Sequence, residues 1–303
     1  MIEIRRILCP IDFSDDSRHA LAHATAVASW YGAAITLLHV SHPEMFTNPP
    51  LLFDDFPRGT GLIEAALRAA EEELPKWSQS VTAAGVSVEI LVESGHPVRH
   101  ILARAAALPA DLVVMGTHGR SGFERLVLGS VTEKVLRKAP CPVMVVPPPA
   151  VTVGKLPYLR LLCPVEFSDS SEAALRFACS IAEEADARLT IVHVFDWQPD
   201  DDLMTARFDT AEYFGAVEQQ ARERLDGLVT DEARVWCKPK TVIARGKPYR
   251  EILTLAETDN VDLIVMGVRG RNPVDLALFG STTNQVVRRA RCPVLTIPSR
   301  RHA

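Results

Sequence analysis

The residues most suited to chemistry form a glycine-rich segment that occurs twice. Residues 116–130 and 267–281 both follow the pattern Gly-x2-Gly-x9-Gly-Ser. Each segment follows a short apolar run typical of a buried strand and leads into a helical pattern. The start of a helix leaves backbone N–H groups unpaired with partial positive charge, and glycines let other amides come close. The expected chemistry is therefore anion binding, with phosphate as the first candidate.

Two simpler interpretations stay open for this segment. Gly116 and Gly267 are explained equally well by close packing of a helix on a strand, and Ser130 and Ser281 by helix capping. The sequence favours nucleotide binding because the glycines and the serine coincide in two copies whose interiors differ.

A carboxylate is the second candidate group. Asp12 follows the first predicted strand, and it can accept hydrogen bonds from ribose hydroxyls or from a base amine. Its alternative role is to cap the helix that begins beside it, where Ser14, Asp15 and Asp16 crowd the same turn. Pro10, Ile11 and Val40 offer an apolar slot for a base, and Arg120 offers a charged contact.

The elements that position these groups alternate regularly. In the first half, strands are predicted at 4–9, 34–40, 86–92, 111–115 and 142–146, with helices between them, the last at 130–138. Such alternation predicts a doubly wound parallel sheet. Ligands of such sheets bind at the carboxyl ends of the strands, where the strand order reverses.

The chain is a tandem duplication. Residues 8–40 and 162–194 align without gaps and share 15 of 33 positions. A length of 303 residues agrees with two domains of this kind. We expect a first domain at 1–148, a linker rich in proline at 149–158 and a second domain at 159–303.

Composition narrows the classes of function. A net charge of −5 provides no basic surface for nucleic acid. No signal peptide and no apolar run of about 18 residues is evident, so we expect a cytoplasmic protein that does not enter a membrane. The six cysteines show no CxxC or zinc-ligand spacing, so we interpret them as buried apolar residues and expect no protein-bound metal.

The two glycine segments, together with the Pro-Ile-Asp-Phe-Ser run at 10–14, resemble the universal stress protein family in its tandem form, across nearly the whole chain. The spacing is similar to that of the ATP-binding subclass. This resemblance implies the adenine nucleotide alpha hydrolase-like fold, with two five-stranded sheets of order 3-2-1-4-5. It also implies ATP or a related adenine nucleotide, with or without Mg²⁺, and pairing of the last strands at 142–146 and 293–297, with possible homodimers.

The candidate nucleotide-binding residues of each half occupy the strand ends, the glycine segment and the following helix start. In the first half they are Pro10, Ile11, Asp12, Val40, Met115, Gly116, Gly119, Arg120, Gly129, Ser130, Val131 and Thr132. In the second half they are Pro164, Val165, Glu166, Val194, Met266, Gly267, Gly270, Arg271, Gly280, Ser281 and Thr282. Glu166 is one methylene longer than Asp12, so we expect the first site to bind more tightly.

The expected function is a nucleotide-dependent stress-response or regulatory module without catalytic residues. The alternative is a slow ATPase or phosphotransferase at the same site. Residues 129–134 lack the GxxxxGK[ST] arrangement of a P-loop, which favours binding. A flavin domain, a third possibility, needs an aromatic slot that the sequence does not offer. No regulatory partner protein is indicated.

Overall fold

A computed structural model of the chain describes residues 2–42, 60–119, 128–148, 158–196, 210–268 and 280–298. The chain divides into two compact units, one of Glu3–Leu156 and one of Pro157–Ala303 together with Met1–Ile2. Most of the predicted linker falls outside the described residues, so the predicted domain boundaries stay a prediction.

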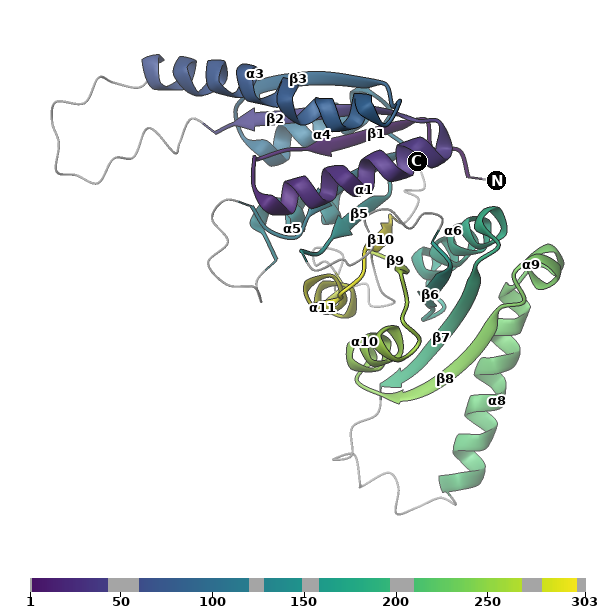
Figure 1. Cartoon of the computed structure of the whole chain (residues 1–303). Coiled ribbons are helices and arrows are strands. Elements are labelled where there is room, and N and C mark those ends of the chain that lie inside the picture. Colours follow the sequence, from purple (N-terminus) through teal and green to yellow (C-terminus); the bar gives the residue numbers. More distant parts are fainter. Residues whose placement is uncertain are drawn as a thin grey trace, which may run out of the picture. The chain divides into compact units, whose positions relative to one another are not determined.

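Strands and helices alternate through the first unit (Figure 1). Its elements are β1 (Arg6–Pro10), α1 (Asp15–Tyr31), β2 (Ala34–Ser41), α3 (Thr60–Ala83), β3 (Val88–Ser94), α4 (Pro97–Ala107), β4 (Leu112–Gly116), α5 (Ser130–Lys138) and β5 (Val143–Val146). The strands are parallel in the order β3-β2-β1-β4-β5. This confirms the predicted doubly wound sheet and its order 3-2-1-4-5.

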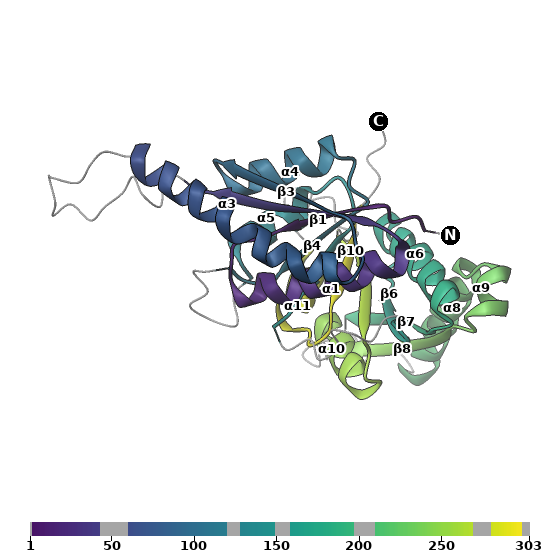
Figure 2. The same cartoon turned by 45° about the horizontal axis from the view of Figure 1, so that its top comes forward.

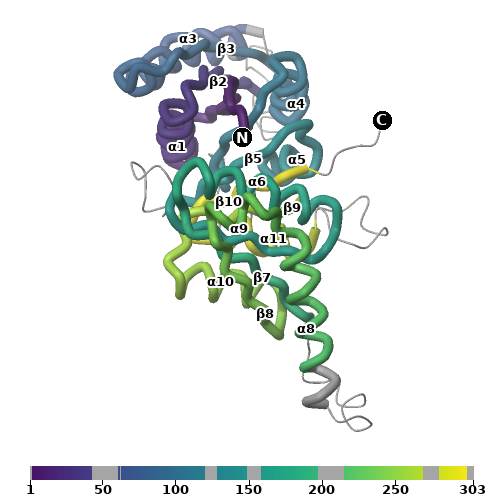
Figure 3. Tube along the Cα trace, turned by 90° about the vertical axis from the view of Figure 1, so that its right-hand side faces the viewer, coloured from purple at the N-terminus to yellow at the C-terminus, as the bar shows by residue number. Residues whose placement is uncertain are grey.

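The second unit repeats this plan with one additional short helix. Its elements are β6 (Arg160–Pro164), α6 (Asp169–Ala185), β7 (Arg188–Asp196), α8 (Thr210–Leu228), α9 (Asp231–Trp236), β8 (Lys240–Gly246), α10 (Pro248–Thr258), β9 (Leu263–Gly267), α11 (Ser281–Arg289) and β10 (Val294–Ile297). Its strand order is β8-β7-β6-β9-β10, again parallel, and β7 and β8 run side by side in Figure 3.

Helices cover both faces of each sheet. In the first unit α1 and α3 pack on one face, and α4 and α5 on the other (Figure 2). The inner strands are apolar because both of their faces are covered. Leu8 of β1 and Val113 of β4, which are partners across the sheet, are both fully buried. The core therefore fixes the relative position of the ends of β1 and β4.

The helix that follows β1 has clear sequence signals at both ends. The Ser14 side chain accepts a hydrogen bond from the Ser17 N–H, and Asp15 and Asp16 occupy the first turn, where the helix dipole favours acids. Gly32 ends the helix in a left-handed conformation, with φ of 65°. These signals place the start of α1 directly beside the end of β1.

Within the described residues, no helix has the length and apolar character needed to cross a bilayer.

Candidate functional site

The site lies where the strand order reverses. In the first unit β1 and β4 are neighbours, but the chain leaves β1 toward β2 and reaches β4 from the far edge. Asp12 follows β1, and the glycine segment follows β4. The two groups lie in close contact. Oδ2 of Asp12 is so near to Gly119 that a Cβ atom added to this glycine would collide with it. The fold therefore brings the predicted carboxylate and the predicted anion-binding segment together.

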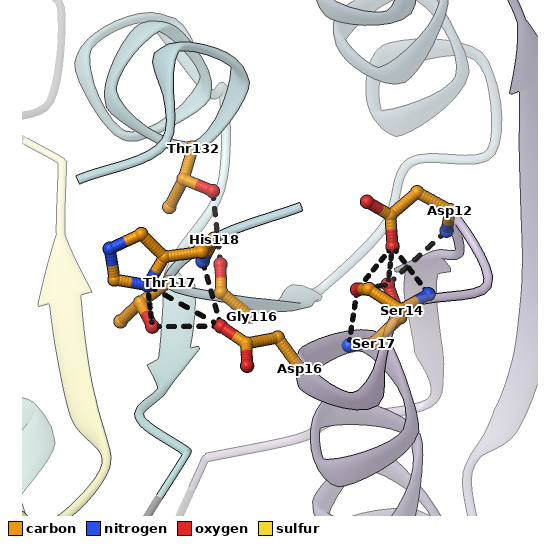
Figure 4. A network of polar contacts seen from close by, with 8 residues as sticks. All are labelled: Asp12, Ser14, Asp16, Ser17, Gly116, Thr117, His118 and Thr132. Atoms are coloured by element: carbon orange, nitrogen blue, oxygen red, sulfur yellow. Dashed lines mark hydrogen bonds and ion pairs between the residues drawn. The ribbon is translucent and has the colours of Figure 1, made fainter. Parts of the chain in front are cut away.

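The Asp12 carboxylate is held by the start of α1 (Figure 4). Its Oδ1 accepts hydrogen bonds from the Ser14 backbone N–H (3.1 Å), the Ser14 hydroxyl (2.5 Å) and the Ser17 hydroxyl. The Ser17 hydroxyl also accepts from the Asp12 N–H (3.2 Å). Asp12 thus takes part in the helix start, as one interpretation of the sequence held, but the cap itself is Ser14.

A second acid, Asp16, anchors the beginning of the glycine segment. Its Oδ2 accepts from the His118 N–H (3.0 Å) and the Thr117 hydroxyl (3.2 Å), and it lies 3.5 Å from Nδ1 of His118. Figure 4 shows this network beside the Asp12 group. From the sequence, Asp16 was expected only in the crowded helix turn. Its contact with a segment 100 residues away depends on how α1 packs on β4, which no local signal reveals.

Gly116 and Gly267 are required by this packing. A Cβ atom on Gly116 would lie 2.8 Å from the Cβ of Asp16, and one on Gly267 would lie 2.7 Å from the carbonyl carbon of Ser170. Real Cβ atoms do not approach so closely, so a side chain here would push the helix from the strand. The close-packing interpretation is therefore confirmed for these two glycines.

The helix start after the glycine segment is capped by glycine and not by serine. The cap residues of α5 and α11 are Gly129 and Gly280, and neither helix start has a capping hydrogen bond from a side chain. Ser130 and Ser281 are the first helical residues and are exposed. The interpretation of these serines as caps was wrong. A glycine cap offers no side-chain oxygen, which leaves the first-turn amides for an external acceptor.

Thr132 has a structural bond in addition to its predicted place around the phosphates. It is 4% exposed, and its hydroxyl donates to the carbonyl oxygen of Gly116 (2.9 Å). Thr283 makes the same bond to Gly267 (2.9 Å). Thr283, which was not predicted as a site residue, is therefore the counterpart of Thr132, and both threonines join the helix start to the end of the preceding strand.

The second unit contains a cleft of about 520 Å³ at the corresponding place. Of the eleven residues predicted there, Gly270 and Arg271 lie outside the described residues, as does Arg120 in the first unit. The nine others all line this cleft, and they are Pro164, Val165, Glu166, Val194, Met266, Gly267, Gly280, Ser281 and Thr282.

Further lining residues were not predicted. His193, Phe195 and Asp196 come from the end of β7, and Pro248 and Ile252 come from α10. One signal was available for the α10 side, because the Gly-Lys-Pro at 246–248 repeats the Gly-His-Pro at 95–97. His193 also had one, because the His-Val at 193–194 repeats that at 39–40, whereas Phe195 and Asp196 have no matching residue in the first half.

The two carboxylates are held differently. Glu166 Oε1 accepts from the Ser168 hydroxyl at 3.1 Å. Ser171, the counterpart of Ser17, donates its hydroxyl to the Ser168 carbonyl (2.9 Å). Asp12 is half-buried, whereas Glu166 is exposed. The Ser17 hydroxyl thus donates to the site carboxylate, whereas the Ser171 hydroxyl donates to the backbone of its own helix start.

The thiols next to the site are buried in the core and are not reactive groups. Cys9 and Cys163 precede Pro10 and Pro164 and are completely buried. Burial raises the pKa of Cys9 to about 12 and that of Cys163 well above its ordinary value. Both thiols are therefore protonated at neutral pH and are poor nucleophiles. The described residues contain no group of three or more histidines, cysteines or acids arranged to hold a metal ion.

Comparisons with known proteins all find similarity to one protein family. The model of the universal stress protein family matches twice, at residues 3–147 and 157–298. A universal stress protein of Mycobacterium bovis is 25% identical over 299 residues, covering 95% of each chain. One of Methanocaldococcus jannaschii is 34% identical over 150 residues, covering 48% of this chain and 83% of its own.

A solved structure is similar over nearly the whole length of the chain. The crystal structure of a universal stress protein from Archaeoglobus fulgidus is similar with a TM-score of 0.69 and 25% identity, and the match covers 97% of this chain and 98% of that one. With two family matches that together span most of its length, the chain belongs to the universal stress protein family.

Proposed function

We propose that each domain binds ATP or a related adenine nucleotide, and that the protein acts as a nucleotide-dependent regulatory module in the response to stress. The phosphates would lie at the start of α5 or α11. The ribose would lie against Asp12 or Glu166, and the base against the apolar ends of the strands. This arrangement uses all the candidate groups in the roles that suit their chemistry.

The observation that carries the proposal is that a hydrogen-bond acceptor, the carboxylate, and a set of hydrogen-bond donors, the helix start, lie at the same end of neighbouring strands in both domains. A carboxylate, which accepts hydrogen bonds from hydroxyls, follows β1 and β6. A helix start capped by glycine, which donates to anions, follows the neighbouring strands β4 and β9. A nucleotide has hydroxyl donors at its ribose and acceptors at its phosphates, so it satisfies both groups at once.

The cleft of the second unit also has a suitable size and lining. Small-molecule sites have volumes of roughly 300–1,000 Å³ and combine apolar walls with a few polar groups. The 520 Å³ cleft fits this range, with Val165, Val194 and Met266 as apolar walls. Binding is favoured over hydrolysis because the segment after Gly129 lacks the lysine of a P-loop.

The proposal is tested by placing a negative charge where the phosphates would bind. Ser130 and Ser281 are exposed at the first helical position, where an acid is compatible with the helix and stabilises it by roughly 0.3–1 kcal/mol. Ser130→Asp and Ser281→Asp should therefore fold normally. Each should weaken ATP binding in its own domain by about tenfold or more, measured by isothermal titration calorimetry.

The matched controls are Ser130→Asn and Ser281→Asn, which have the same size without the charge. They should bind ATP with nearly the affinity of the unchanged protein. Equal binding by the Asp and Asn variants would show that phosphates do not occupy the helix start.

A further inference from the structure

A phenylalanine with an unusual backbone follows the site carboxylate in both domains. Phe13 has φ of 65° and Phe167 has φ of 63°. This left-handed region is unfavourable for a bulky L-residue, because its Cβ crowds the backbone. Such a conformation persists only where surrounding contacts enforce it.

The contacts that enforce it begin with a histidine on the neighbouring strand. The ring centroids of Phe13 and His39 lie 4.6 Å apart, and those of Phe167 and His193 lie 4.7 Å apart. Nδ1 of His39 lies 2.8 Å from the Ile11 carbonyl oxygen, and Nδ1 of His193 lies 2.7 Å from that of Val165. Because a carbonyl oxygen only accepts, Nδ1 carries the proton in both histidines.

The histidine therefore holds the chain on both sides of the carboxylate. It donates a hydrogen bond to the residue before Asp12, and its ring packs against the residue after it. The same three-residue arrangement surrounds Glu166, with His193 as the histidine. We call Phe13 with His39, and Phe167 with His193, the Phe–His clamp.

The helix that follows the neighbouring strand supports each clamp from outside. In the first domain Phe13 makes a T-shaped contact with Trp77 of α3, with ring centroids 5.6 Å apart and an interplanar angle of 77°, and Trp77 is 5% exposed. In the second domain the guanidinium of Arg224 on α8 lies 4.2 Å from the centre of the Phe167 ring. The supporting residues differ between the domains, whereas the clamp itself is the same in both.

The left-handed turn at Phe13 determines where the carboxylate points. With Phe13 in this conformation, both the N–H and the hydroxyl of Ser14 donate to Oδ1 of Asp12. The other oxygen, Oδ2, faces Gly119 of the anion-binding segment. In the second domain His193 and Glu166 line the same cleft.

We infer that the Phe–His clamp is a positioning device, in which Phe13 and Phe167 hold the adjacent carboxylate toward the ribose hydroxyls of a bound nucleotide. The inference rests on the proposed function, since it assigns the residues that orient the ribose-binding group. The clamp lies beside the carboxylate and not at the helix start proposed for the phosphates, so its contribution should be confined to recognition of the sugar.

The test uses the double variant Phe13→Gly/Phe167→Gly. Glycine adopts positive φ without strain, so the backbone is allowed while the ring is lost. Calorimetry compares ATP with 2′,3′-dideoxy-ATP, which lacks the hydroxyls that the carboxylate would bind. The unchanged protein should prefer ATP by about tenfold or more, the value expected for hydrogen bonds to a charged group. In the Gly variant the ratio of the affinity for ATP to that for the dideoxy compound should fall close to one. The affinity for the dideoxy compound itself should be retained.

The conservative double variant Phe13→Tyr/Phe167→Tyr keeps the rings and should keep the preference for ATP. If circular dichroism shows that the Gly variant does not fold, Phe13→Leu/Phe167→Leu takes its place, since it retains apolar volume but loses the flat ring. The same loss of preference is expected there.

Three results would overturn the inference. The preference for ATP could persist in a folded Gly or Leu variant, both nucleotides could weaken equally, or the unchanged protein could bind both compounds alike. A chain that binds neither compound would instead refute the proposed function, and the inference would fall with it.

Discussion

At the scale of single residues, the two sites differ most at the carboxylate. Asp12 Oδ1 is fixed by the Ser14 and Ser17 hydroxyls, whereas Glu166 accepts from Ser168 and is exposed. A group that is already fixed loses less side-chain entropy on binding. Glu also has one more rotatable bond to immobilise than Asp. Both differences favour the first site.

Exchanging Asp12 and Glu166 should reverse which of the two sites binds ATP more tightly. We expect Asp12→Glu to weaken ATP binding in the first domain by a few fold, and Glu166→Asp to strengthen it in the second by a similar factor, since an immobilised side chain costs about 0.5–1.5 kcal/mol. Titration under limiting ATP, with the other domain blocked by Ser281→Asp or Ser130→Asp, measures each site alone. Equal affinities of the two unchanged sites would contradict this explanation.

At the scale of elements, the site depends on the close approach of α1 to β4 and of α6 to β9. The glycine at the end of each strand allows this approach, and a buried threonine of the next helix bonds to the carbonyl of that glycine. Strand end, helix α1 and the start of α5 are thus joined in one unit. Any change that separates them should disturb both the fold and the cleft.

Gly267→Ala tests this packing. The new Cβ would lie 2.7 Å from a backbone carbon of α6, and such overpacking costs roughly 1–3 kcal/mol of folding free energy. Gly215→Ala is the matched control, because Gly215 lies within α8 with no atom within 4 Å of the added Cβ. It should stabilise the domain by about 0.5–1 kcal/mol. Urea unfolding compares the two, and equal effects would show that the close approach does not matter.

Much of the order of helices and strands could be predicted, because local hydrophobic periodicity and capping residues indicate where they begin and end. The helix at 130–138 was predicted with its observed bounds. The third strand begins at Val88, two residues later than predicted. There the Val86 N–H bonds back to the Val81 carbonyl and Gly85 takes φ of 75°, so these residues end α3 and are not free to begin the strand.

The details of the site were less predictable. The contact of Asp16 with His118 and the left-handed Phe13 both depend on tertiary packing between distant segments. The sequence does show that His39 and His193 occupy equivalent positions in the two halves, and both bond to backbone carbonyls. It did not indicate that these bonds flank the carboxylate.

At the scale of the whole molecule, duplication provides two related candidate sites in one chain. Both domains have the same strand order, the same glycine-capped helix start and the same Phe–His clamp. They differ in the carboxylate and in the residues that support the clamp. One chain should therefore respond to two ranges of nucleotide concentration, with the first domain filled before the second.

The most direct measurement is the identity and amount of the compound released when the purified chain is denatured after equilibration with millimolar ATP and removal of the unbound excess. Mass spectrometry and quantitative chromatography should detect an adenine nucleotide, approaching two molecules per chain. The Ser130→Asp/Ser281→Asp double variant should release almost none, whereas the Asn counterpart should match the unchanged protein. Absence of any adenine nucleotide, or equal release by the Asp and Asn double variants, would contradict the proposed function.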